Sequence, residues 1–226
     1  MHLGPFPLEK LKRMLRVDLS AMPAMQPVSF RRPEDPKSIV NAMQEYQAML
    51  DATRDGMVKK EIAEIPDELV ERANHMKSFG YYCDASMVGT CAIDPAVWMG
   101  ETLVNPDVDR LADKLRVMQP KSLAAGIDVI MAGLRESMAL PPADCRHHSH
   151  AVVFLYDHPR APRVDEVGAD WIKDALPQRT CLRASETAVT LASYIRTLGY
   201  EARAHSMAAS DVNLGALAAS AGLVAP

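Results

Sequence analysis

Cysteine is scarce in this sequence, and its cysteines are widely spaced. The 226 residues include four cysteines, and no two of them form a C-x-x-C motif. Iron–sulfur clusters commonly take their ligands from closely spaced cysteine runs, so we expect no 4Fe–4S cluster held within this chain. A disulfide framework is equally unexpected, because the chain is long and its cysteines are few. Reduced thiols in a reducing compartment are the default expectation.

Long apolar runs and an excess of basic charge are also missing. No apolar stretch approaches the roughly 20 residues that a membrane span requires, and the N-terminal residues lack the apolar core of a secretion signal. The pair Arg31-Arg32 precedes Pro33-Glu34-Asp35, which argues against a twin-arginine signal. The formal net charge is −4, so nothing favours nucleic acid or an anionic membrane as a partner. We therefore expect a cytoplasmic protein.

Several common catalytic motifs are absent as well. The sequence contains no G-x-G-x-x-G, Walker loop, G-x-S-x-G or H-E-x-x-H pattern, and these motifs mark dinucleotide, nucleoside triphosphate, hydrolase and metalloprotease sites. Hydrophobic residues, by contrast, are plentiful. They make up 48% of the sequence, which is enough for a substantial core.

Proline divides the chain into two parts. Six prolines lie within residues 1–36, and since proline fixes φ and removes a hydrogen-bond donor, we expect an extended arm there with one short helix near residues 8–16. Residues 37–226 are expected to form a single α/β (α+β) module.

Hydrophobic periodicity predicts alternating helices and strands in that module. Helices are expected over residues 37–53, from Pro66 to Gly80, and over 121–139, 178–198 and 212–222, with a short polar helix or loop at 105–120. Strands are expected at 81–93, 151–156 and 200–205. Residues 151–156 form a continuous apolar run, which is typical of a strand covered on both faces. We expect Gly80 and Gly199 to follow helix ends.

The most unusual segment carries Cys145, His147, His148 and His150. Thiols and imidazoles are ligands of transition metals, so these four residues are candidate metal ligands. Their spacing is poor for one zinc site, because His147 and His148 would point to opposite faces of a regular strand. A polar loop whose histidines bond to backbone or water is the alternative.

A second candidate site precedes the last predicted helix, at Ser210, Asp211 and Asn213. Ser210 or Asp211 is a natural N-cap, and free N–H groups at a helix start also bind phosphate. We expect capping, with contact to a cofactor phosphate as the functional alternative. The helix that follows is almost wholly small and apolar, which is typical of a buried helix.

Three stretches, in this order, resemble reductive dehalogenases and epoxyqueuosine reductases. Together they cover roughly residues 67–223. They are Phe79-Gly80-Tyr81 with Asp84 and Met87-Val88-Gly89, then residues 150–156, then Leu198-Gly199-Tyr200-Glu201-Ala202 followed by Leu217-Ala218-Ala219-Ser220-Ala221-Gly222-Leu223.

The resemblance implies a nitroreductase-like layered fold, incomplete in this chain, that in the family holds cobalamin. Family members continue into a ferredoxin-like domain with two 4Fe–4S clusters, whereas this sequence stops at residue 226. The implied partner is therefore an iron–sulfur domain or subunit, and a homodimer is a further arrangement. The proton donor and the cluster cysteines lie downstream in the family, so the resemblance assigns no catalytic residue here.

Three functions stay open. In the first, the chain is the N-terminal module or a fragment of a corrinoid- and iron–sulfur-dependent reductive dehalogenase-like oxidoreductase of the cytoplasmic, catabolic branch. Some members of that branch carry a degenerate, non-catalytic copy of this module, and this chain is a candidate for that copy. Alternatively, it is a binding or assembly module without catalysis. The third function is a flavin-dependent nitroreductase-like enzyme, although we find no clear basic cluster for the flavin phosphate.

Overall fold

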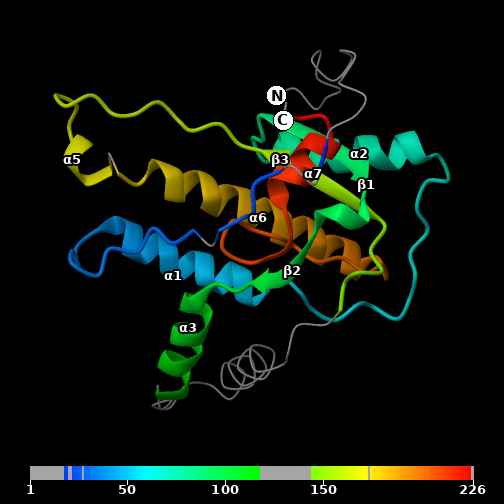
Figure 1. Ribbon diagram of the computed structural model, residues 1–226, viewed down its shortest axis with the longest axis horizontal. Helices are drawn as coiled ribbons and strands as arrows, with labels where there is room; N and C mark the ends of the chain where they lie inside the picture. The colour runs from blue at the N-terminus through cyan, green and yellow to red at the C-terminus, as the bar shows by residue number, and fades with distance from the viewer. Residues whose placement is uncertain (1–17, 20–21, 27, 118–143, 173, 225–226) are drawn as a thin grey trace.

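The computed structural model describes residues 18–19, 22–26, 28–117, 144–172 and 174–224 (Figure 1). The expected helices at 8–16 and 121–139 lie outside these residues. None of the described helices is both long enough and apolar enough to cross a membrane. The elements in chain order are α1 (Ile39–Ala52), α2 (Leu69–Tyr82), β1 (Met87–Ala92), the 3-10 helix η3 (Pro95–Val97), β2 (Trp98–Leu103), α3 (Pro106–Val117), β3 (His150–Leu155), α5 (Ala169–Ile172), α6 (Leu176–Thr197), β4 (Ser210–Val212) and α7 (Leu214–Ser220).

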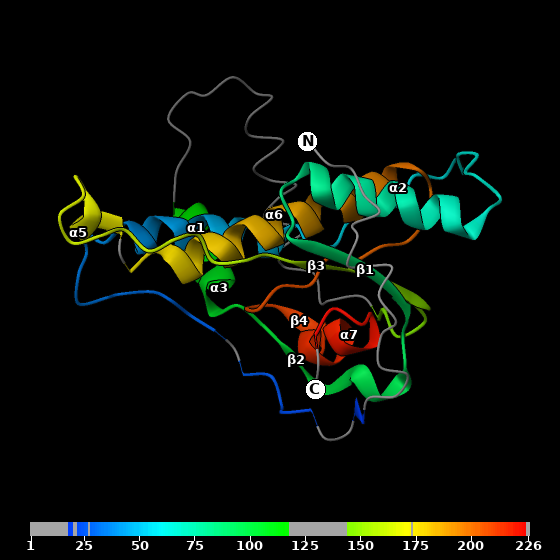
Figure 2. The ribbon, with the colours of Figure 1, turned by 90° about the horizontal axis from the view of Figure 1, so that it is seen from above.

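The strands form two antiparallel ribbons. In the first, β1 pairs with β3, so that Met87 lies opposite Leu155. In the second, β2 pairs with β4, Trp98 lies opposite Val212, and the register is irregular further along. Figure 2 shows the β1–β3 ribbon between a layer that contains α1, α2 and α6 and a layer that contains α7, β2 and β4. The chain is thus a mixture of helices and strands, which is consistent with the α/β class that the order of elements predicted. The nitroreductase-like arrangement stays a prediction.

Both faces of β3 make apolar packing contacts. Because side chains alternate along a strand, Val152 and Phe154 pack on the α2 side of the ribbon, while Ala151 and Val153 pack toward Leu217 of α7. The continuous apolar run predicted a strand buried on both faces. Both faces do make packing contacts, but the side chains of β3 are half-buried or exposed, because the strand also lines a cavity.

Gly80 has a different role from the one predicted. It lies inside α2, not beyond its end. A Cβ at this position would lie 2.6 Å from Val88 Cγ2 and 2.7 Å from Phe154 Cε1. The glycine therefore permits α2 to approach the ribbon closely, and the strand expected from residue 81 begins only at Met87 because α2 continues to Tyr82.

Gly199 does follow a helix end, as predicted. Its φ is +88°, a conformation that favours glycine. Its N–H donates to the carbonyl of Arg196, and the N–H of Tyr200 donates to that of Ile195. A Cβ on Gly199 would also lie 2.5 Å from the backbone oxygen of Glu61.

Two predictions for the C-terminal part are wrong. Residues 200–205 form no strand. Instead, the N–H of Ala204 donates to the carbonyl of Arg54, and the Arg196 guanidinium donates to the carbonyl of Ala202. The last helix was expected from residue 212 with Ser210 or Asp211 as its N-cap. It begins instead at Leu214, and its N-cap is Asn213, whose Oδ1 accepts from the N–H of Ala216.

The described part of the N-terminal arm lies along the module. The N–H of Val28 donates to the carbonyl of Met207, and Arg31 pairs with the buried Asp107 of α3 at 2.9 Å. These contacts attach the arm both to the segment after α6 and to α3.

We expect Gly80→Ala to lower the free energy of unfolding by about 1–3 kcal/mol, because the added methyl overpacks the contact between α2 and the ribbon. Gly100→Ala is the matched control, since a Cβ there meets nothing within 4 Å and its stability should be unchanged or slightly raised. Denaturant unfolding measures both. Equal stability of the two variants would contradict the close approach.

Candidate functional site

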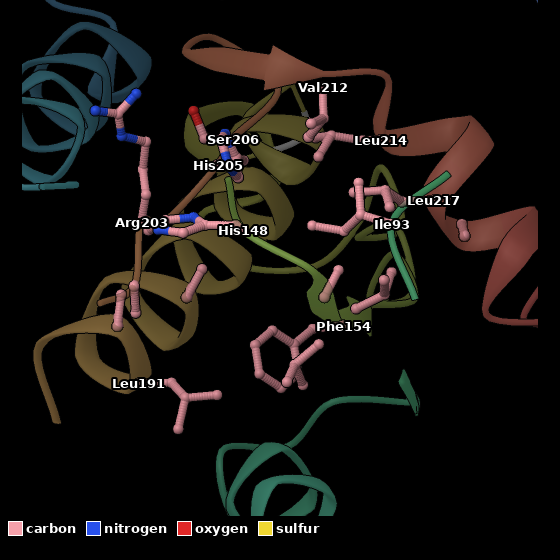
Figure 3. A pocket seen from close by; sticks show the side chains of 18 of the residues that line it. Ile93, His148, Phe154, Leu191, Arg203, His205, Ser206, Val212, Leu214 and Leu217 are labelled. Atoms are coloured by element: carbon pink, nitrogen blue, oxygen red, sulfur yellow. The ribbon is translucent and has the colours of Figure 1, made fainter. Parts of the chain in front are cut away.

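A cavity of about 690 Å³ opens between β3, α6, the segment 201–207 and α7 (Figure 3). Its walls are mostly apolar, with Phe154 from β3, Leu191 from α6 and Leu217 from α7 among the lining residues. Polar side chains gather at one end, where Figure 3 shows His148, Arg203 and His205 together. A largely apolar cavity with a few convergent polar groups is the usual form of a ligand site.

Arg203 organises the polar end. The turn at Gly199 ends α6 and is followed by the segment that carries Arg203 into the cavity wall. Its guanidinium binds Asp55 Oδ2 at 2.5 Å and Asp211 Oδ2 at 3.1 Å, and it donates to the Cys145 thiol at 3.3 Å. The side chain is only 2% exposed, so these partners replace almost all of its hydration.

Asp211 holds a second guanidinium. Arg54 Nη1 lies 3.1 Å from Asp211 Oδ2, and the Thr102 hydroxyl donates to Oδ1 at 2.8 Å. Burial alone would raise the pKa of Asp211, but the charge of Arg54 and the Thr102 hydrogen bond outweigh burial and hold the pKa below its usual value. The guanidinium groups of Arg203, which lines the cavity, and of Arg54, which does not, are therefore both neutralised by carboxylates of the chain itself.

His205 is held neutral. Its Nδ1 accepts the backbone N–H of Asp211 at 3.3 Å, which a protonated ring could not do. Burial is the main cause that lowers the pKa of His205, to about 4, and the charge of Arg54 lowers it further while Asp211 opposes the shift. The ring thus contributes no positive charge near neutral pH.

The four predicted metal ligands do not form one group. Cys145 is buried and stands with His205 and Asp211, while His147 and His148 stand with Glu201; within each group the ligand atoms lie within 4.8 Å of one another. His150 begins β3, and its Nδ1 contacts the Ser149 hydroxyl at 2.9 Å. Sequence spacing gave no sign of Glu201 or His205, because both come from the segment after α6.

The three predicted cofactor-binding residues are engaged within the chain. Ser210 is fully buried and donates to the carbonyl of Val212 at 2.7 Å. Asp211 belongs to the ion network that Arg54, Asp55, Arg203 and Asp211 form. Asn213 caps α7 while its amide donates to the carbonyl of Pro23 at 2.9 Å. No described contact of these side chains favours the phosphate alternative over capping and internal bonding.

The cavity residues do not fit a whole corrinoid. A corrinoid carries polar amide side chains and a phosphate, and buried polar groups need hydrogen-bonding partners. Most of the lining is apolar, and Arg203, the one arginine or lysine among the described lining residues, is already paired. The same pairing disfavours a flavin phosphate.

We expect Asp211→Asn to lower the free energy of unfolding by on the order of 2 kcal/mol or more, since it leaves Arg54 partly buried without its carboxylate. Glu166→Gln is the matched control, because Glu166 forms an exposed pair with Arg160 and such pairs contribute little. Thermal and denaturant unfolding measure both variants. If Asp211→Asn were as stable as this control, the ion network would not hold the site.

Acid should destabilise the fold through His205. Its pKa falls from 6.5 to about 4 on folding, so its contribution to stability is full above pH 6.5 and is lost as the pH falls toward 4. Going from about pH 7.5 to about pH 5, we expect the stability of the wild type to drop relative to His205→Gln by about 2 kcal/mol. A difference that stays constant with pH would show that His205 is free to ionise.

Comparison with known proteins shows that this chain is similar to one part of several longer proteins of solved structure. No protein-family model and no curated protein matches the chain. Solved structures do match. The catabolic reductive dehalogenase NpRdhA is 30% identical, with a TM-score of 0.64 over 97% of this chain. Its complex with 3-bromo-4-hydroxybenzoic acid gives 30% identity, a TM-score of 0.65 and the same coverage.

A further match is a reductive dehalogenase whose structure suggests a mechanism for B12-dependent dehalogenation. It is 31% identical, with a TM-score of 0.63 over 96% of this chain. The matched part is 25% of the first of these three chains and 24% of each of the other two. Over nearly its whole length, the chain is therefore similar in sequence and fold to about a quarter of a reductive dehalogenase.

Proposed function

We propose that the chain is the N-terminal, non-catalytic module of a corrinoid- and iron–sulfur-dependent reductive dehalogenase-like oxidoreductase in the cytoplasm. The observation that carries this proposal is the match itself: 97% of the chain is aligned at 30% identity, yet this is only 25% of the matched protein. A module of that size needs further polypeptide to complete a reductase.

The polar end of the cavity supports the non-catalytic part of the proposal. Arg54 and Arg203 are bound to Asp55 and Asp211, and His205 is neutral and hydrogen-bonded. In a binding site, by contrast, a few polar groups have hydrogen-bonding or charge capacity left for a ligand. When it is bound in the complete enzyme, a corrinoid supplies the reductive chemistry, and we assign its site to polypeptide outside this chain.

Exposed apolar side chains support a role in assembly. Around α5, Val164 is 97% exposed and Trp171 is 80% exposed, and Val167 is fully exposed. Large apolar side chains close together on a surface often mark contacts with other protein. We propose that the iron–sulfur domain or subunit covers this region; a homodimer is the second arrangement. A flavin enzyme remains the alternative function, and the pairing of Arg54 and Arg203 weighs against it.

The isolated chain should not change the visible spectrum of hydroxocobalamin, and it should not retain FMN on gel filtration. A complete reductive dehalogenase such as NpRdhA, freshly depleted of its cofactor, is the positive control for the cobalamin titration. A stoichiometric corrinoid shift with the isolated chain would contradict the non-catalytic role.

The module role has its own test. The DNA that adjoins the coding region should encode cysteine runs of the C-x₂-C-x₂-C type, either in frame or in a neighbouring gene. Co-expression with that product should yield a complex that carries both corrinoid and iron–sulfur absorption. If no such coding sequence adjoins this one, or if the two products do not associate, the module role is wrong.

A further inference from the structure

His147 and His148 lie in a tight turn, not on a strand. The Asp144 carboxylate accepts the N–H of Arg146 at 3.0 Å, and the N–H of His148 donates to the carbonyl of Cys145 at 3.0 Å. The two rings consequently meet edge to face, with centroids 4.7 Å apart and planes at 71°. The objection that neighbouring residues point to opposite faces applies to a regular strand, and β3 begins only at His150.

A carboxylate from a distant part of the chain joins the two rings. Glu201 follows the Gly199 turn, and its Oε2 contacts His147 Nε2 and lies 3.8 Å from His148 Nε2. All three ligand atoms lie within 4.8 Å of one another. Bonds of about 2.0–2.2 Å to a tetrahedral zinc ion place its ligands roughly 3.4 Å apart. Small rotations of the exposed His147 and Glu201 side chains, which are 57% and 59% exposed, would reach this spacing.

The neighbouring group of potential ligands is unsuited to a cation. In that group Cys145 and Asp211 both accept from the Arg203 guanidinium, and Asp211 also accepts from Arg54. A divalent ion among these side chains would face two fixed positive charges and would have to displace them. Among the described residues, the contacts of the Glu201 carboxylate are with the two imidazoles.

We propose that His147, His148 and Glu201 bind one divalent transition-metal ion, of which Zn²⁺ is the best match. Two imidazoles and one carboxylate are a ligand set that zinc uses where a coordination position is left for water or substrate. All three residues line the cavity, so water or a ligand in the cavity completes the coordination. Metal binding here is independent of whether the chain belongs to a larger enzyme.

The full-length chain, with its affinity tag removed and stripped of metal by a chelator, is the material for the test. Calorimetric titration with Zn²⁺ should give one ion per chain, and Co²⁺ should give the visible absorption of a tetrahedral or five-coordinate site. His147→Ala and Glu201→Gln should each weaken Zn²⁺ binding about 10-fold or more, since each removes one of three ligands.

His150→Ala is the matched control. It removes an imidazole from the same segment, but one that lies outside the three-residue group, so the affinity should stay within about 2-fold of the wild type. Circular dichroism and the unfolding midpoint verify that the variants fold. Three results would overturn the site: no stoichiometric binding, equal losses with His150→Ala and His147→Ala, or loss of binding with Cys145→Ser while Glu201→Gln binds normally.

Discussion

The pairing of the buried Arg203 with two carboxylates is the constraint on which the site depends. An arginine side chain does not lose its charge in a protein, so a guanidinium that is 2% exposed must be compensated by anions. Asp55, just after α1, and Asp211, in β4, provide that compensation, and Cys145 accepts a further hydrogen bond. Two segments far apart in sequence, near Asp55 and Cys145, are thereby attached to the segment that follows α6, and Asp211 lies only eight residues beyond Arg203. These contacts fix Arg203 in the cavity wall.

The same pairing separates two neighbouring groups of potential metal ligands. Inside the network, both arginines bind Oδ2 of Asp211 and the Thr102 hydroxyl donates to Oδ1, while burial keeps His205 neutral. Nearer the solvent, burial and the charge of His147 lower the pKa of His148, and Glu201 pairs with imidazoles instead of guanidinium groups. The position of the guanidinium groups therefore decides which group can accept a cation.

Local patterns predicted the local features of the fold, and features that depend on distant partners were missed. The helical period placed α1 and α6 within a few residues of their bounds, and the glycine after α6 adopts the positive φ expected of it. Gly80 looked equivalent in sequence, but packing against Val88 and Phe154 determines its role. β2 was not predicted, and Glu201 was not recognised as part of the site. Neither carries a local signal: β2 pairs with a three-residue strand, and Glu201 is 54 residues away from the imidazole it contacts.

Apart from the group of His147, His148 and Glu201, the polar end of the cavity differs from that of a typical active site, whose walls are likewise mostly apolar. An active site keeps a few polar groups unsatisfied for its substrate inside a shaped cavity. Here the charges of Arg54 and Arg203 are satisfied internally, the cavity walls beside β3 are mostly apolar, and further apolar side chains such as Trp171 face the solvent. Exposed apolar surface is a free-energy cost that contact with other polypeptide removes. The matched structures are about four times as long as this chain, and under the proposed module role the exposed apolar surface is where further polypeptide would make contact.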